Sequence, residues 1–278
     1  MFVVGGCGGD SEEGTPGQFT GVPLEAQDPG PVHVHGLGYD AEQEILYIAT
    51  HTGLFELLPD AEKARRIGDS YQDTMGFTLV SSDVFLGSGH PDLRASLPSQ
   101  LGLIKSTDRG RSWDSVSLLG ESDFHVLRAQ GKNVYGFDTR SERLLASTNA
   151  GRSWRRLVPP EALLDLAIHP TNPRHLLASG GSVLYESPDG GRTWKAVANG
   201  LAGHLAWPGS GRAYLADLGG SFLTASTPSG PWRPRGAIGS PVAALLAVDA
   251  RTLFAALHDG TIVRSADGGA TWKVRAAP

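Results

Sequence analysis

Cysteine is almost absent from this chain of 278 residues, because Cys7 is the only one. A single cysteine excludes an intrachain disulfide and any zinc site built on cysteine ligands. No apolar run approaches the roughly 18 residues that a membrane-spanning helix needs. Basic residues form no stripe, and the net charge is −5. Nucleic acid is therefore not an expected partner.

The surroundings of Cys7 indicate where the protein works. Val4, Gly5 and Gly6 precede it, and the segment up to residue 31 is polar and poor in core-forming residues. This arrangement resembles the lipobox of bacterial lipoproteins, although the charged n-region and most of the h-region of a signal peptide do not precede it. The resemblance implies a bacterial, extracytoplasmic protein that is anchored to the membrane by lipid on Cys7, with residues 1–31 as terminus and flexible tether. An incidental cysteine in a glycine-rich terminus is the alternative.

Glycine and proline are plentiful, at 37 and 18 residues, which is typical of many short strands joined by turns. One eight-residue turn recurs, with Ser first, Asp or Asn third, Gly fifth and Trp last. The first three copies begin 41 and 40 residues apart, and the fourth begins 78 residues after the third, close to twice that spacing. The copies are STDRGRSW at 106–113, STNAGRSW at 147–154, SPDGGRTW at 187–194 and SADGGATW at 265–272.

A worn copy, STPSGPW at 226–232, stands in the middle of the last interval and keeps the Ser, Gly and Trp. A repeat of about 40 residues is typical of a four-stranded propeller blade. Each unit contains short strand patterns between turns, and the pattern extends to two units before the second copy of the turn. The sequence therefore predicts an all-β, six-bladed β-propeller with four-stranded antiparallel blades over residues 32–278. The units begin near residues 35, 75, 124, 165, 204 and 243.

The recurring turn resembles the Asp box, or BNR repeat, of the sialidase superfamily. The chain as a whole is similar to bacterial exported propellers described as BNR-repeat or glycosyl-hydrolase-like, through segments such as HVHGLGYD and GSGHPD. The resemblance implies that the turns join the third and fourth strands of a blade and lie far from the active site. Their residue types suit a structural role, since Asp can close its own turn and Trp can fill the space between blades. The residues concerned are Asp108, Asn149, Asp189 and Asp267, with Trp113, Trp154, Trp194 and Trp272.

If these turns mark one face of the propeller, the starts of the innermost strands and the ends of the second strands lie on the other face. Seven of the nine histidines map to this second face, at two positions that converge on the central axis. Strand starts carry His33, His35, His125 and His204, and strand ends carry His51, His90 and His258. Met75 and several carboxylates fill analogous positions.

A convergent ring of imidazoles suits a transition metal, because neutral imidazole is the commonest metal ligand. Histidine with methionine favours copper, whereas histidine with aspartate favours zinc, iron or manganese. We expect copper, with zinc next. The first candidates as ligands are His35, His125, His204 and His258, followed by His33, His51, His90 and Met75. A groove for a small molecule or carbohydrate, and a wet channel without any ligand, remain alternatives.

An enzyme is a further alternative, because two carboxylates on one face are the minimal requirement for glycoside hydrolysis. The candidates are Asp123, Asp138, Asp165 and Asp217. Sialidase activity itself is not expected, since no arginine begins an innermost strand and no arginine triad is recognisable. A protein-binding or assembly module is the third class, with the insertion at 91–100 as a possible lid or contact. We expect a monomer.

Overall fold

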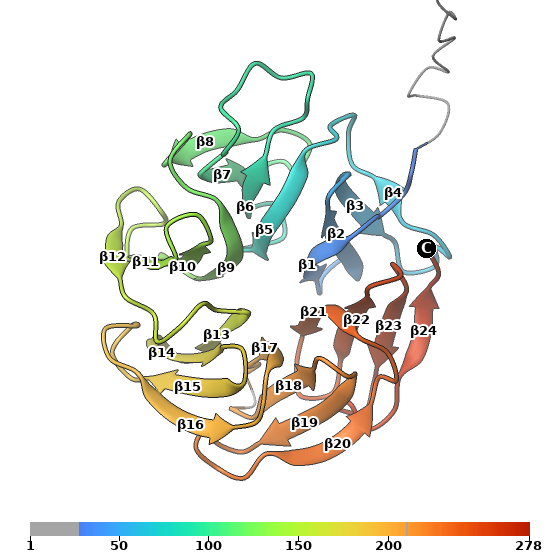
Figure 1. The fold of residues 1–278 in the computed structure, drawn as a ribbon. Coiled ribbons are helices and arrows are strands. Elements are labelled where there is room, and N and C mark those ends of the chain that lie inside the picture. The colour runs from blue at the N-terminus through green and yellow to red at the C-terminus, as the bar shows by residue number, and fades with distance from the viewer. Residues whose placement is uncertain (1–27, 210) are drawn as a thin grey trace, which may run out of the picture.

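The computed structural model describes residues 28–209 and 211–278, which form six four-stranded antiparallel sheets in a closed ring (Figure 1). The predicted six-bladed β-propeller is thereby confirmed. Cys7 lies outside the described residues. No helix in the described chain has the length and apolarity required to cross a membrane.

Every blade consists of four consecutive strands. Blades 1 and 2 contain β1 (Val34–Asp40), β2 (Ile45–Thr50), β3 (Gly53–Leu57) and β4 (Arg65–Arg66), then β5 (Asp73–Leu79), β6 (Phe85–His90), β7 (Leu103–Ser106) and β8 (Asp114–Ser117). Blades 3 and 4 contain β9 (Phe124–Gln130), β10 (Asn133–Asp138), β11 (Arg143–Ser147) and β12 (Arg155–Leu157), then β13 (Asp165–His169), β14 (Asn172–Ser179), β15 (Val183–Ser187) and β16 (Lys195–Asn199). Blades 5 and 6 contain β17 (Gly203–Ala206), β18 (Ala213–Asp217), β19 (Ser221–Ala225) and β20 (Arg233–Ala237), then β21 (Val242–Ala247), β22 (Leu253–Leu257), β23 (Ile262–Ser265) and β24 (Lys273–Ala276).

The ring closes by packing of the last blade against the first, and no strand is exchanged between them. A single buried cluster spans the junction, and in it Ile48 and Phe55 of blade 1 pack with Phe254 of blade 6. Arg275 on β24 also donates hydrogen bonds to the carbonyl oxygens of Leu58, at 2.6 Å, and of Ala61, at 2.7 Å. Apolar burial and these charged hydrogen bonds together hold the two ends of the repeat in place.

The pairing of the strands defines two faces. The innermost strands β1, β5, β9, β13, β17 and β21 begin on the same face on which the second strands end, and this face is called the histidine face below. The connections between third and fourth strands lie on the opposite face, called the turn face, and all four copies of the recurring turn are among them. The structure therefore confirms the assignment of the two faces from the sequence.

Hydrogen bonds within the recurring turn explain why its residue types recur. In blade 2 the buried Ser106 hydroxyl accepts from the Gly110 amide at 2.7 Å and donates to Asp108 Oδ1 at 2.8 Å. Asp108 in turn accepts from the Ser112 amide at 2.9 Å and from the Ser112 hydroxyl at 2.6 Å. Asn149 forms the same turn with its amide group in blade 3, donating through Nδ2 to Ser153. The side chain at the third position thus closes the turn on itself.

Replacing Asp108 with alanine is expected to lower the free energy of unfolding by about 1–2 kcal/mol, because a buried hydroxyl and an amide lose their acceptor. Asp108→Asn should cost much less, since Asn149 already forms this turn in the neighbouring blade. Urea unfolding at neutral pH measures both variants. Equal losses for alanine and asparagine would show that the turn does not depend on this acceptor.

The same carboxylates make the fold sensitive to acid. Hydrogen bonds from the side chain and amide of Ser112 hold the pKa of Asp108 at about 2. The amides of Thr193 and Thr271 likewise lower the pKa of Asp189 and of Asp267 to about 2. Because these values lie below those of the unfolded chain, the stabilisation is complete above about pH 4 and is lost as the pH falls toward about 2. The stability difference between the wild type and Asp108→Asn should therefore shrink over that window.

Candidate metal centre

The first three blades open with related segments at the histidine face: HVH at 33–35, DTM at 73–75 and DFH at 123–125. The last residue of each segment is the extra residue of a β-bulge, because the pairing with the following strand skips His35, Met75 and His125. These three residues therefore hold the same position on neighbouring inner strands. A bulge redirects a side chain locally and is frequent beside functional sites.

Pairing is regular at the starts of β13 and β17, and the bulge of β21 carries Ala243. The chemically equipped bulges are thus confined to blades 1, 2 and 3. We call the polar side chains on this part of the histidine face the histidine arc. It comprises His33, His35, His51, Asp73, Met75, His90, Asp123 and His125.

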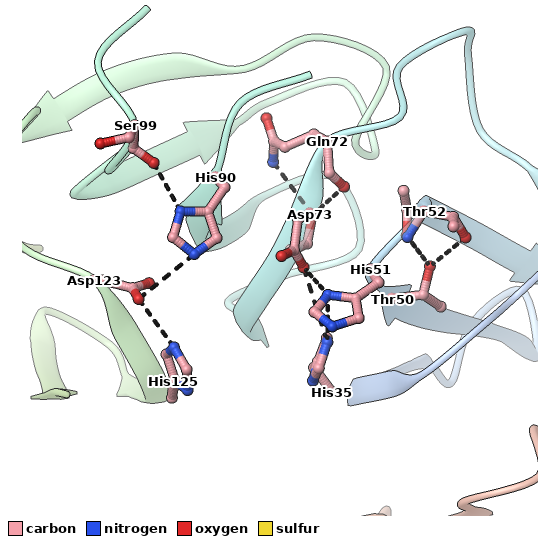
Figure 2. A network of polar contacts seen from close by, with 12 residues as sticks. His35, Thr50, His51, Thr52, Gln72, Asp73, His90, Ser99, Asp123 and His125 are labelled. Atoms are coloured by element: carbon pink, nitrogen blue, oxygen red, sulfur yellow. Dashed lines mark hydrogen bonds and ion pairs between the residues drawn. The ribbon is translucent and has the colours of Figure 1, made fainter. Parts of the chain in front are cut away.

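The tightest group in the arc is formed by His35 of β1, His51 after β2 and Asp73 of β5 (Figure 2). Their ligand atoms all lie within 4.8 Å of one another. His35 Nε2 is 3.2 Å from His51 Nδ1, and Asp73 Oδ1 is 2.7 Å from His51 Nδ1 and 3.8 Å from His35 Nε2. The ring of His33 lies 5.3 Å from that of His51.

Asp73 Oδ1 is buried and makes no contact with hydrogen-bond geometry, although His51 Nδ1 is close to it. Two nitrogens and an oxygen that share a metal at 2.0–2.1 Å in tetrahedral geometry would be separated by about 3.3 Å. The three observed separations, 2.7, 3.2 and 3.8 Å, lie on both sides of this value. The group therefore has the size and donor set of a transition-metal site with an open position.

His35 is prepared for such a role by its surroundings. Burial, followed by the neighbouring imidazoles of His51, His125 and His33, lowers the pKa of His35 to about 4. Its ring is consequently neutral near pH 7 and keeps the lone pair that a metal requires.

A second group repeats the pattern one blade further along (Figure 2). His90 at the end of β6 places Nε2 3.7 Å from Asp123 Oδ2, and His125 Nε2 is 2.9 Å from the same oxygen. His90 Nδ1 donates to the carbonyl oxygen of Ser99 at 2.7 Å, so the insertion at 91–100 orients this ring. Burial raises the pKa of Asp123, but His125 and then His90 outweigh it and the net pKa is lowered. Asp123 Oδ1, like Asp73 Oδ1, is buried without a hydrogen bond.

The remaining histidines lie apart from these two groups. His204 Nδ1 is 3.8 Å from Asp165 Oδ2 on the opposite part of the ring, and His258 is exposed, with its amide bonded to the carbonyl oxygen of Pro241. His169 and His175 stack with ring centroids 5.2 Å apart, and both contact the edge or face of Trp207.

Three of the four candidate carboxylates serve structural hydrogen bonds. Asp138 accepts from the Asp123 amide at 2.9 Å and from the Ser141 hydroxyl. Asp217 accepts from two amides of the following turn, those of Gly219 and Ser221. Asp165 on β13 accepts from Arg128 on β9 at 2.5 Å and from the Leu205 amide on β17 at 2.9 Å. Asp123 alone faces the histidine arc.

Asp73 is the member of the tightest group that was not among the sequence-based candidates. The signal that would have found it is the alignment of HVH, DTM and DFH, in which Asp73 takes the position of Asp123. Contacts between blades confirm the equivalence, because His51 approaches Asp73 as His90 approaches Asp123.

No family model and no curated protein matches this chain. Solved structures with a similar fold include a GH74 enzyme from Niastella koreensis, with a TM-score of 0.64 and 16% identity over 88% of this chain and 45% of that chain. The GH74 xyloglucanase from Xanthomonas campestris has a TM-score of 0.58 and 20% identity over 88% and 45%. YCF48 bound to D1 peptide has a TM-score of 0.55 and 15% identity over 90% and 84%. The chain spans less than half the length of the two GH74 enzymes. These likenesses place the protein among the β-propellers.

Proposed function

We propose that this protein is a lipid-anchored, extracytoplasmic propeller that binds a transition metal at the histidine arc. The observation that carries the proposal is the convergence of His35, His51 and Asp73, whose ligand atoms all lie within 4.8 Å of one another. The lipid anchor on Cys7 and the bacterial, extracytoplasmic location depend on the lipobox resemblance. The hydrogen bonds of the recurring turns support the relation to the Asp-box propellers.

Copper is the favoured metal. Sites of nitrogen and oxygen donors bind copper(II) more tightly than the other divalent metals of the first transition row, including zinc. Met75 adds a reason, because its bulge position lies on the strand between those of His35 and His125. A thioether is a soft ligand that suits copper(I). Zinc, which accepts two imidazoles, a carboxylate and water, is the second choice.

Protein purified without an affinity tag is expected to retain about one equivalent of copper after dialysis. Three side chains would bind the metal, and its fourth coordination position would stay open. His51→Gln and Asp73→Asn should each weaken copper binding at least about tenfold. Replacing residues that only hydrogen-bond to metal ligands already lowers metal affinity by that amount, and these two variants replace ligands themselves. Elemental analysis and competitive titration with copper and zinc measure both quantities.

His258→Gln is the matched control. His258 follows the second strand of blade 6 as His51 follows that of blade 1, and it is exposed away from the group. The control variant should bind copper like the wild type. A wild type without metal after dialysis, or equal weakening by His258→Gln and His51→Gln, would refute the metal site.

Glycoside hydrolysis is the second candidate function, and Asp123 is the observation in its favour, because this carboxylate is charged, faces the arc and has a free buried oxygen. Its weakness is the lack of a second free carboxylate among Asp138, Asp165 and Asp217. Turnover of a chromogenic glycoside that is abolished by Asp123→Asn and not by metal removal would favour the enzyme. If the protein is instead a protein-binding module, the variants His51→Gln and Asp73→Asn should still bind its partner.

A further inference from the structure

A cavity lies on the turn face, between the recurring turns of blades 3 and 4. Its volume is about 480 Å³, within the range of sites for small molecules. Three arginines from different elements line it: Arg155 on β12, Arg174 on β14 and Arg192 in the turn at 187–194. The chain as a whole has a net charge of −5, so this concentration of positive charge runs against its average.

The arginines have no carboxylate partners within residues 28–209 and 211–278. In these ranges no ion pair forms at Arg155 or Arg174, and the Arg192 guanidinium donates to the backbone oxygen of Asp189, while the Arg192 amide donates to the Asp189 carboxylate. Asp189 is the one acidic residue in the lining, and its carboxylate already accepts the amide and hydroxyl of Thr193. Three exposed arginines therefore line one cavity with a single carboxylate that is already engaged in hydrogen bonds.

The neighbouring inter-blade groove shows that this is not a requirement of the fold. Arg174 and Lys132 hold equivalent positions, because the carbonyl oxygen of each accepts from the amide of the fourth residue of the recurring turn in its own blade. Arg155 and Asp114 are equivalent as well, since both follow the turn on the outermost strand. Blades 2 and 3 thus combine Asp114 with Lys132, whereas blades 3 and 4 combine two arginines. Like charges at facing positions are unfavourable unless an anion binds between them.

We infer that this cavity, called the arginine groove, binds an acidic saccharide that carries sulfate or carboxylate groups. Arginine is the side chain best suited to such anions, because its planar fork can bind two oxygens at once. The rest of the lining suits a sugar body. The amide of Asn133 and the hydroxyl of Thr148 offer hydrogen bonds to hydroxyl groups, and the half-buried Trp154 offers an aromatic surface.

Isothermal titration calorimetry at low salt tests the inference by measuring the binding of a sulfated disaccharide, of digalacturonic acid and of neutral cellobiose. The wild type should bind at least one of the acidic sugars and should not bind cellobiose. Arg155→Gln and Arg174→Gln should each weaken binding about tenfold or more, as expected for the loss of a charged hydrogen bond. Arg143→Gln is the matched control, because Arg143 is an exposed arginine of the same blade outside the lining.

A stability measurement separates ligand binding from misfolding. Removal of one of several like charges should leave the melting temperature unchanged or raise it, and the acidic sugar should raise it in the wild type more than in Arg155→Gln. Absence of binding to both acidic sugars would overturn the inference. So would equal weakening by Arg143→Gln and Arg155→Gln, which would indicate only diffuse electrostatic attraction. Copper binding plays no part in either readout, so the metal site and the arginine groove can fail independently.

Discussion

Arg128→Met is expected to lower the free energy of unfolding by about 3–5 kcal/mol, because it leaves a buried carboxylate without its counter-charge. Asp165 is 1% exposed and lies 2.5 Å from Arg128, while its other oxygen accepts from the Leu205 amide. Arg128 belongs to β9, Asp165 to β13 and Leu205 to β17. The Asp165 carboxylate therefore joins the inner strands of three successive blades. Equilibrium unfolding in urea measures the loss of stability in Arg128→Met.

The pH dependence of the variant identifies the cause. Burial raises the pKa of Asp165, but Arg128, His204 and the Leu205 amide outweigh it, so the net pKa is lowered. Without Arg128 the effect of burial should dominate and the pKa of Asp165 should rise. A carboxyl with a raised pKa is less costly to bury once it is protonated, so the stability deficit should shrink as the pH falls toward about 4.

The ion pair between Arg109 and Asp83 is a matched control for Arg128. Its atoms are 2.7 Å apart, but the side chains are 34% and 62% exposed. Arg109→Met should cost less than about 1 kcal/mol, because solvent screens exposed pairs. Arg128→Met combined with Asp165→Asn should recover part of the loss. Equal losses at the two sites, or no recovery in the double variant, would show that burial of the charge is not the reason.

The fold was predictable from the sequence because each blade is a local unit with its own turn. Asp108 and Gly110 close the turn through hydrogen bonds to residues at most four positions away, so its chemistry is visible in eight letters. The worn copy also forms its turn, with Gly230 bonded to Thr227, without the acidic side chain. Blade 1 has no such turn, and its outermost strand β4 spans only Arg65–Arg66.

The site was predictable only in part, because its members come from different blades. Residue type and position placed His204 and His258 among the first candidates with His35 and His125, and they placed His51 and His90 only in the second group. Contacts between blades make the difference, because His51 approaches Asp73 and His90 approaches Asp123, and in the sequence they are indicated only indirectly, by the related segments HVH, DTM and DFH. The arginine groove was hidden for the same reason, since Arg155, Arg174 and Arg192 are separated along the chain.

Two glycines at equivalent positions can separate the stability of the fold from the geometry of the site. Gly36 and Gly76 directly follow the bulge residues His35 and Met75. A Cβ atom at Gly76 would lie 2.4 Å from the carbonyl oxygen of Phe124, whereas one at Gly36 would lie 3.0 Å from the Cβ atom of Phe77. Both glycines therefore permit the close approach of neighbouring inner strands.

Gly76→Ala is expected to destabilise the fold by about 2–3 kcal/mol, because the clash is with backbone that cannot rotate away and β9 must move from β5. Gly36→Ala should cost less, but it moves β1 from β5, between His35 and Asp73. Copper affinity should therefore fall in Gly36→Ala and persist in Gly76→Ala, opposite to the order of stability. Gly181→Ala, where a Cβ atom would meet nothing closer than 3.8 Å, is the control. If copper affinity instead followed stability across the three variants, the metal would not be held across the junction of β1 and β5.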